Sequence, residues 1–162
     1  MNMQRPRFAV DAMLGNLAKK FRILGYDAKY FSSIEDEKLI ELARNENRIL
    51  LTKDELLKKN AQKSGITNIL VRGSDEIEQI IQITTAVGLG SFTIDTNFSR
   101  CVSCNGKLQL IDKSNIANKV PRGVFDKQDK FWTCDACKKI YWEGTHFQKL
   151  QEFVSRLNER MK

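Results

Sequence analysis

The chain has 162 residues, of which 41% are hydrophobic and 29% are charged, a composition typical of a folded protein and not of a disordered one. This length allows one compact domain with a small appended module. No apolar run approaches the roughly 20 residues of a membrane-spanning helix, which argues against a membrane partner. The first residues also lack the apolar stretch of a secretory signal, so we expect a cytoplasmic protein. Paired cysteines inside cells bind metal more often than they form disulfides.

The net charge of +7 is distributed unevenly along the chain. Residues 1–96 contain 14 Lys and Arg against 13 Asp and Glu, whereas residues 97–162 contain 13 against 7. A basic module favours an anionic partner such as RNA, because phosphate contacts release counterions. A solvated lysine-rich surface explains the charge equally well.

The first part of the chain alternates between strand-like and helix-like segments. Strands are expected at 7–11, 28–31, 48–52 and 66–71, each followed by an amphipathic or capped helical pattern. This alternation predicts an α/β domain with a parallel sheet of about four strands and covering helices. The third and fourth strands are apolar runs, as expected when both faces of a sheet are covered.

The alternation stops after a transition segment rich in Gly, Ser and Thr at 88–99. Short strand-like pieces follow at 107–111 and 131–133, and the last segment has the pattern of an amphipathic helix. We therefore predict two domains, an α/β domain at 1–94 and a smaller module with a C-terminal helix at 95–162.

Two C-x-x-C pairs, separated by 29 residues, contain every cysteine of the chain: Cys101, Cys104, Cys134 and Cys137. Two such turns facing each other form a tetrahedral site for Zn²⁺, with bonds of about 2.3 Å. A closed site of four cysteines leaves no position open for substrate, so the predicted role of the zinc is structural. His146, the single histidine, is not needed as a ligand and is expected to pack at the start of the last helix or to contact nucleic acid.

Acidic residues follow each of the four predicted strands: Asp11, Asp36, Asp54 and Asp75. Because the carboxyl ends of parallel strands share one edge of a sheet, these side chains are expected in one crevice. Carboxylates there bind Mg²⁺ or Mn²⁺, which activates water for attack on a phosphate. Asp54 and Asp75 also fit the helix N-cap role, and for Asp75 the cap is favoured.

The sequence lacks the motifs of other hydrolytic and nucleotide-binding sites. The sequence contains no Walker motif and no G-x-G-x-x-G loop. A single histidine also disfavours a histidine-dependent triad and a two-histidine ribonuclease mechanism.

Segments from nearly the whole chain resemble the Mut-seven C-terminal RNase domain family, a PIN-like nuclease group with an appended zinc ribbon. The segments that carry the resemblance are Phe8–Asp27, Asp36–Ala43, Arg48–Asp54, Phe98–Gly106, Val120–Pro121, Phe131–Cys137 and Tyr141–His146.

This resemblance implies a PIN-like three-layer α/β fold followed by a four-cysteine zinc ribbon and a C-terminal helix. It also implies a metal-dependent ribonuclease, a hydrolase of phosphodiester bonds for which an endonucleolytic mode is expected. By position, Asp11, Asp36 and Asp54 are the implied ligands of catalytic Mg²⁺ or Mn²⁺, with Thr52 supporting Asp54. Asp75 is the candidate for a fourth, supporting residue.

Basic and aromatic residues provide candidate contacts to RNA. The predicted RNA-binding residues are Lys20, Arg22, Arg72, Arg100, Arg122, Lys138 and Lys139. Lys20 and Arg22 fit the solvated face of the first helix equally well. Trp132, Tyr141 and Trp142 are able to stack on bases, but packing of the ribbon against the neighbouring domain is favoured for them.

Two other hypotheses fit the same residues. A non-catalytic RNA-binding zinc-ribbon adaptor would use the acids as helix caps and surface charge. A toxin-like nuclease held by an antidote protein is the third. The sequence does not require a protein partner, and it leaves the RNA substrate and the oligomeric state open.

Overall fold

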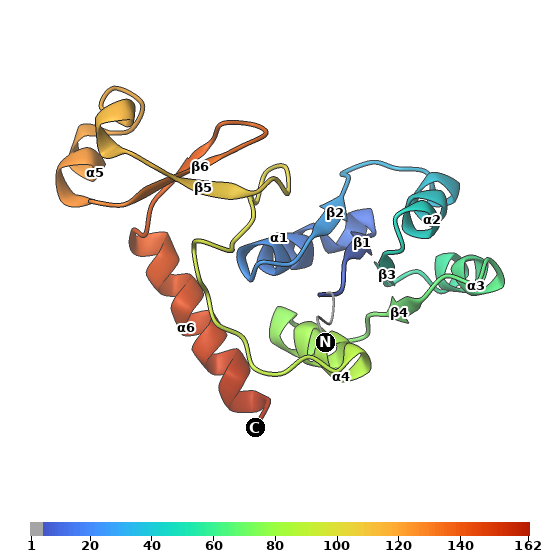
Figure 1. Ribbon diagram of the computed structural model, residues 1–162. Coiled ribbons are helices and arrows are strands. Elements are labelled where there is room, and N and C mark those ends of the chain that lie inside the picture. The colour runs from blue at the N-terminus through green and yellow to red at the C-terminus, as the bar shows by residue number, and fades with distance from the viewer. Residues whose placement is uncertain (1–4) are drawn as a thin grey trace. The chain divides into compact units, whose positions relative to one another are not determined.

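The computed structural model describes residues 5–162, which form two compact units (Figure 1). The first unit contains the chain up to Arg22 together with Tyr26–Ser91, and the second contains Ile23–Gly25 and Phe92–Lys162. The division near Ser91 lies close to the domain boundary expected from the sequence. None of the described helices combines the length and the apolar character that crossing a membrane requires.

The first unit is built from alternating strands and helices, as predicted. Its elements in chain order are β1 (Phe8–Val10), η1 (Ala12–Leu14), α1 (Gly15–Ile23), β2 (Ala28–Tyr30), α2 (Asp36–Asn45), β3 (Ile49–Thr52), α3 (Glu55–Lys63), β4 (Asn68–Leu70) and α4 (Glu76–Val87).

The four strands form one parallel sheet in the order β2-β1-β3-β4. The chain therefore leaves β1 toward β2 on one side and then returns to pair β3 on the other side. Such a reversal of strand order opens a crevice at the carboxyl ends of the two central strands, where α/β proteins place their ligands. In this sheet the crevice lies between the ends of β1 and β3.

Helices cover both faces of this sheet, which explains the apolar strands. Ala9 of β1 and Leu50 of β3 belong to a buried cluster with residues of α2 and α3. The neighbouring residue Phe8 points to the opposite face, where its ring lies 4.7 Å from that of Phe21 in α1. An ion pair of 3.0 Å between Lys20 and Glu76 joins α1 to α4. The result is a three-layer α/β/α arrangement.

The second unit contains an antiparallel sheet in the order β5-β6-β7 and ends in the long helix α6. Its elements are β5 (Leu108–Ile111), η2 (Lys113–Ile116), α5 (Arg122–Lys127), β6 (Phe131–Cys134), β7 (Ile140–Tyr141) and α6 (Thr145–Arg160). The predicted C-terminal helix is confirmed. The two short helices were not predicted, because α5 has only six residues and buries none of them, so it shows no amphipathic period.

Helix α6 has one buried apolar stripe, and one polar contact joins it to the start of its own unit. Phe153, Val154 and Leu157 are buried along the stripe. The side chain of Asn158 accepts a hydrogen bond from the backbone N–H of Phe92 (2.8 Å) and donates one to its carbonyl oxygen (2.6 Å). These two hydrogen bonds attach Phe92, near the start of the second unit, to helix α6.

Candidate functional site

Asp11 lies directly after β1, and hydrogen bonds to both carboxylate oxygens hold it in place. The residue is 9% exposed. Its Oδ1 accepts from the backbone N–H of Ala12 (2.8 Å), and its Oδ2 accepts from the hydroxyl of Thr52 (2.7 Å). Thr52 is fully buried at the end of β3. The crevice between β1 and β3 therefore contains a carboxylate whose orientation is set by the neighbouring strand.

Asp54 is joined to the same network through Thr52. The Thr52 hydroxyl accepts a hydrogen bond from the backbone N–H of Asp54 (2.9 Å) while it donates to Asp11. Oδ1 of Asp54 accepts from the backbone N–H groups of Leu56 (2.8 Å) and Leu57 (3.2 Å), which makes it the N-cap of α3. Asp54 is thus a helix cap, yet it remains exposed, and these bonds leave its second carboxylate oxygen unused.

Asp36 is the exposed first residue of α2. Partial loss of hydration raises the pKa of its carboxyl, and the negative charges of Asp11 and Asp54 raise it further. Three carboxylates that follow three different strands therefore interact electrostatically. The negative charges of Asp11 and Asp54 disfavour the ionised form of Asp36, and a bound divalent cation would offset this repulsion.

The carboxylates do not form a closed cage of ligands. Among residues 5–162, only the four cysteines form a group of three or more potential ligands with all ligand atoms within 4.8 Å of one another. Mg²⁺ suits an open arrangement, because it keeps several waters and binds few carboxylates directly.

The repulsion at Asp36 predicts a stability gain on neutralisation. The folded protein holds this proton more tightly than the unfolded chain does, so ionisation destabilises the fold as pH rises above 3.8, the carboxyl's ordinary value. We expect Asp36→Asn to raise the melting temperature by roughly 1–3 °C near pH 7 in divalent-free buffer, because solvent screens an exposed charge.

Calorimetry near pH 7 and near pH 3 measures this effect, and the gain should vanish at the lower pH, where the wild-type carboxyl is protonated. Glu37→Gln is the matched control, because it removes one negative charge from the same helical turn. Equal stabilisation by both variants would contradict a specific repulsion at Asp36.

Asp75 adopts the cap role that the sequence favoured. Its Oδ1 accepts from the backbone N–H of Glu78 (2.8 Å) at the start of α4. It also lines a pocket of about 570 Å³, together with Tyr30 of β2 and Lys53, the residue before Asp54. The other walls follow β1 and β4, so this pocket opens at the carboxyl edge of the sheet.

Tyr30 is a candidate binding residue that sequence analysis missed. A Cβ atom at Gly15 would lie only 2.7 Å from the Tyr30 hydroxyl oxygen, so a side chain at Gly15 would displace the ring. The one available signal was a glycine four residues after Asp11, which does not identify its distant partner.

The three predicted RNA contacts of the first unit differ from one another in exposure and in bonding. Arg72 is exposed, and Lys20 forms the ion pair with Glu76. Arg22, by contrast, is buried and donates from Nε to the carbonyl oxygen of Ala28 (2.8 Å). The prediction of Arg22 as an RNA contact was wrong, because its guanidinium holds α1 to the start of β2.

The four cysteines of the second unit converge on one point. The Sγ atoms of Cys101 and Cys137 lie 3.6 Å apart, and those of Cys104 and Cys134 lie 3.4 Å apart. A tetrahedral ion with bonds of about 2.3 Å requires sulfur separations of roughly 3.8 Å. The donor set and its spacing therefore fit a metal ion such as zinc.

The two C-x-x-C turns have the same backbone conformation. In each turn the first cysteine donates to the carbonyl oxygen five residues later, and its own carbonyl oxygen accepts from the N–H four residues later. The residue after the second cysteine has a left-handed backbone in both turns, with φ of 69° at Asn105 and 67° at Lys138. Repeated turns of this form bring two pairs of thiolates together from distant parts of the chain.

Gly106 and Tyr141 complete the surroundings of the sulfur atoms. A Cβ atom at Gly106 would lie 2.6 Å from the Sγ of Cys134, so only glycine leaves room for the sulfur. The Tyr141 hydroxyl lies 2.9 Å from the Sγ of Cys101. Burial alone would raise the pKa of Cys101, but hydrogen bonds, first among them the one from Tyr141, lower it to about 7. Such outer contacts orient metal ligands.

Comparison with known protein families decides the assignment. The model of the Mut7-C RNAse domain matches residues 6–154. The chain belongs to the Mut7-C RNAse domain family. The resemblance seen in the sequence is therefore confirmed, and the family supports a ribonuclease with RNA as its class of substrate. No curated protein and no solved structure matches the chain.

The cysteine-bearing unit of this Mut7-C RNAse domain exposes basic groups around an aromatic pocket of about 240 Å³. Arg100, Lys139, Tyr141, Trp142 and His146 contribute to its lining. Arg100 donates to the carbonyl oxygen of Asn105 (3.0 Å), and the ammonium of Lys139 lies 5.4 Å from the Tyr141 ring centre.

The remaining predicted contacts of the second unit of this Mut7-C RNAse domain differ in exposure. Arg122 and Lys138 are exposed, and the Lys138 ammonium donates to the carbonyl oxygen of Asp135 (2.9 Å). Trp132, in contrast, is buried and donates to the side chain of Asn97 of the same unit (3.2 Å).

Proposed function

We propose that this Mut7-C RNAse domain hydrolyses RNA phosphodiester bonds endonucleolytically, with Mg²⁺ or Mn²⁺ held by Asp11, Asp36 and Asp54. The observation that carries the proposal is the electrostatic coupling of these three carboxylates at the point where the strand order reverses. When bound there, a divalent ion supplies an activated water and a charge that stabilises the attacked phosphate.

The residues around the carboxylates have distinct roles in this proposal. Thr52 holds Asp11 and the backbone of Asp54 in one network, so the two carboxylates keep a fixed relation. The pocket beside them offers Tyr30 for stacking on a base and Lys53 for contact with a phosphate. Arg72 adds exposed positive charge on the same unit, Lys20 would contact RNA beside its ion pair with Glu76, and Asp75 contributes as the cap of α4.

For the second unit we propose a structural Zn²⁺ bound by the four cysteines. Its thiolates fill all four positions of a tetrahedral ion, so the zinc has no place for substrate. Arg100, Arg122, Lys138 and Lys139 would contact RNA phosphates, which accounts for the excess of positive charge in residues 97–162. In this proposal the protein acts in the cytoplasm, and its sequence does not itself require a protein partner.

The test of this function is RNA cleavage as a function of divalent ions. Chelators would also remove metal from the cysteine site. The protein is therefore exchanged into metal-free buffer, and its zinc content is measured before each assay. We expect no cleavage of single-stranded or structured RNA without added ions and turnover after addition of Mg²⁺ or Mn²⁺. Undiminished cleavage in metal-free buffer by purified protein would contradict the proposal.

A non-catalytic RNA-binding adaptor is the second candidate. The observation that favours it is the helix-cap role of Asp54 and Asp75, together with the open spacing of the carboxylates. This candidate predicts salt-sensitive RNA binding without turnover and no stabilisation by Mn²⁺. Mn²⁺-dependent stabilisation that Asp11→Asn abolishes would exclude it.

A further inference from the structure

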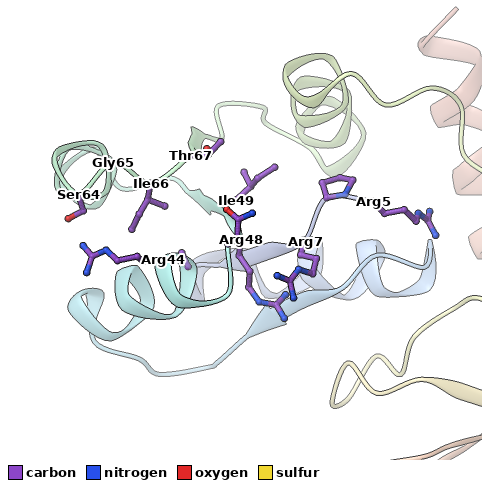
Figure 2. A pocket seen from close by; sticks show the side chains of 12 residues that line it. Arg5, Arg7, Arg44, Arg48, Ile49, Ser64, Gly65, Ile66 and Thr67 are labelled. Atoms are coloured by element: carbon purple, nitrogen blue, oxygen red, sulfur yellow. The ribbon is translucent and has the colours of Figure 1, made fainter. Parts of the chain in front are cut away.

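A second pocket of the first unit lies at the amino ends of the central strands, opposite to the carboxylate edge (Figure 2). Its volume is about 450 Å³. Four arginines line it, Arg5, Arg7, Arg44 and Arg48, and its lining contains no acidic residue. They come from the segment before β1, the end of α2 and the start of β3, and we call this site the arginine pocket.

One of the four arginines is structural. The Arg48 side chain is only 2% exposed, and its guanidinium binds the carboxylates of Asp27 (2.7 Å) and Glu46 (3.0 Å). It also donates to the carbonyl oxygen of Phe8 (3.1 Å). These partners neutralise its charge, so Arg48 fixes β1, β2 and β3 at this edge and offers little attraction to a ligand.

Arg7 and Arg44 present positive charge without an acidic partner. Both are exposed, and within residues 5–162 neither takes part in an ion pair. Arg7 donates to the backbone carbonyl of Glu46, a neutral acceptor that leaves its charge uncompensated. The Arg5 guanidinium lies 4.1 Å from the centre of the Tyr26 ring.

The helix ends at the arginine pocket account for only part of its positive charge. The C-terminal ends of α2 and α3 border the arginine pocket, and cations near such ends are stabilising. Two helix ends together carry about one negative elementary charge, whereas Arg7 and Arg44 alone carry two positive charges. The excess positive charge favours an anion, and guanidinium groups bind phosphate with two parallel hydrogen bonds.

A groove of about 620 Å³ connects the arginine pocket with the carboxylate edge. It runs between α2 and α3, and both Asp36 and Arg44 line it. These residues are eight positions apart on α2, which corresponds to roughly 12 Å along the helix axis. Glu37 lines the groove beside Asp36, Glu41 lies between Asp36 and Arg44, and Lys63 of α3 also lines it. The cationic end of the groove is therefore the end at the arginine pocket.

We propose that the arginine pocket binds a phosphate group of the RNA strand whose scissile bond lies at the carboxylates. Its identification as an RNA phosphate rests on the proposed ribonuclease function. Because one helix carries Asp36 and Arg44, the distance between the two sites is fixed. A phosphate held by Arg7 and Arg44 then sets the position of cleavage a constant few nucleotides away.

The test measures RNA binding in the Asp11→Asn background, which leaves the cysteines intact and prevents turnover. The probe is a fluorescent oligouridylate of about 12 nucleotides, within the range of single-strand site sizes. We expect the Arg7→Gln/Arg44→Gln double substitution to weaken binding by about tenfold. The slope of log affinity against log salt should fall by about 0.7, the value for the one phosphate that is no longer neutralised.

The matched control is Lys38→Gln/Lys59→Gln, which removes two charges from exposed positions of α2 and α3 outside both pockets. We expect it to weaken binding by less than about threefold. Equal effects of the two double variants would overturn the proposal. Far-ultraviolet circular dichroism and melting temperature establish that both variants are folded, and Arg48 is left intact because its removal would unfold this edge.

A second experiment measures stabilisation of the protein by inorganic phosphate, which tests phosphate binding in the absence of RNA. Stabilisation by phosphate that the arginine variant loses, together with weakened RNA binding, supports the proposal. Loss of phosphate stabilisation with unchanged RNA binding overturns it in favour of a small phosphorylated ligand. Should the wild type never cleave RNA while the arginine variant still binds RNA tenfold more weakly, the proposed nuclease fails and the phosphate site stands.

Discussion

Asp11→Asn is expected to lower the rate of RNA cleavage by roughly 10³-fold, the loss typical of removing a group that positions or activates the attacking water. The substitution removes the charge that a divalent cation requires from the most buried of the three carboxylates. Asparagine has nearly the same shape, and its side-chain oxygen is still able to accept the hydrogen bond from Thr52, at the cost of the bond from the N–H of Ala12. The fold should therefore persist while turnover is lost.

Single-turnover cleavage of a labelled RNA in Mn²⁺ measures this effect, with calorimetry to establish that the variant is folded. Glu55→Gln serves as the control, because it removes one exposed negative charge next to Asp54, at the start of α3. We expect the control to retain wild-type rates. A cleavage rate within about tenfold of wild type for Asp11→Asn would show that another group carries the chemistry.

Cys134→Ser is expected to abolish metal binding and to unfold the second unit. The Cys134 side chain is fully buried and accepts weak hydrogen bonds from the N–H groups of Ala136 and Cys137. Structural zinc sites contribute roughly 10–16 kcal/mol of apparent binding free energy, more than a small domain's net stability. A three-stranded sheet and one long helix cannot replace a contribution of this size.

Both tryptophans, Trp132 and Trp142, lie in the second unit, so their fluorescence reports on that unit alone. We expect Cys134→Ser to contain almost no zinc and to show the red-shifted emission of exposed tryptophan. Ser103→Ala, in the first cysteine pair, is the control that should keep one zinc per chain. Wild-type emission from a zinc-free Cys134→Ser protein would mean that the metal does not hold this unit together.

The sequence alone determined most of the local elements and the cluster of four cysteines. Alternating strand and helix patterns predicted the parallel sheet and its two covering layers, because each buried face leaves a period in the sequence. The two C-x-x-C pairs predicted the cysteine cluster, because the spacing of two residues between the cysteines is typical of a metal-binding turn. Asp11, Asp36 and Asp54 were identified as candidates because each follows a strand, and the carboxyl ends of parallel strands share one edge.

Only the tertiary structure decided which side chains meet across distant segments. The Thr52–Asp11 hydrogen bond, the contact of Tyr30 with Gly15 and the burial of Arg22 all depend on the strand order β2-β1-β3-β4, which no local pattern encodes. The arginine pocket arises in the same way, because Arg7 and Arg44 are 37 positions apart and line one pocket only where β1 begins and α2 ends at one edge. Periodicity reports which face of an element is buried, whereas the partner on that face is set by how the whole chain packs.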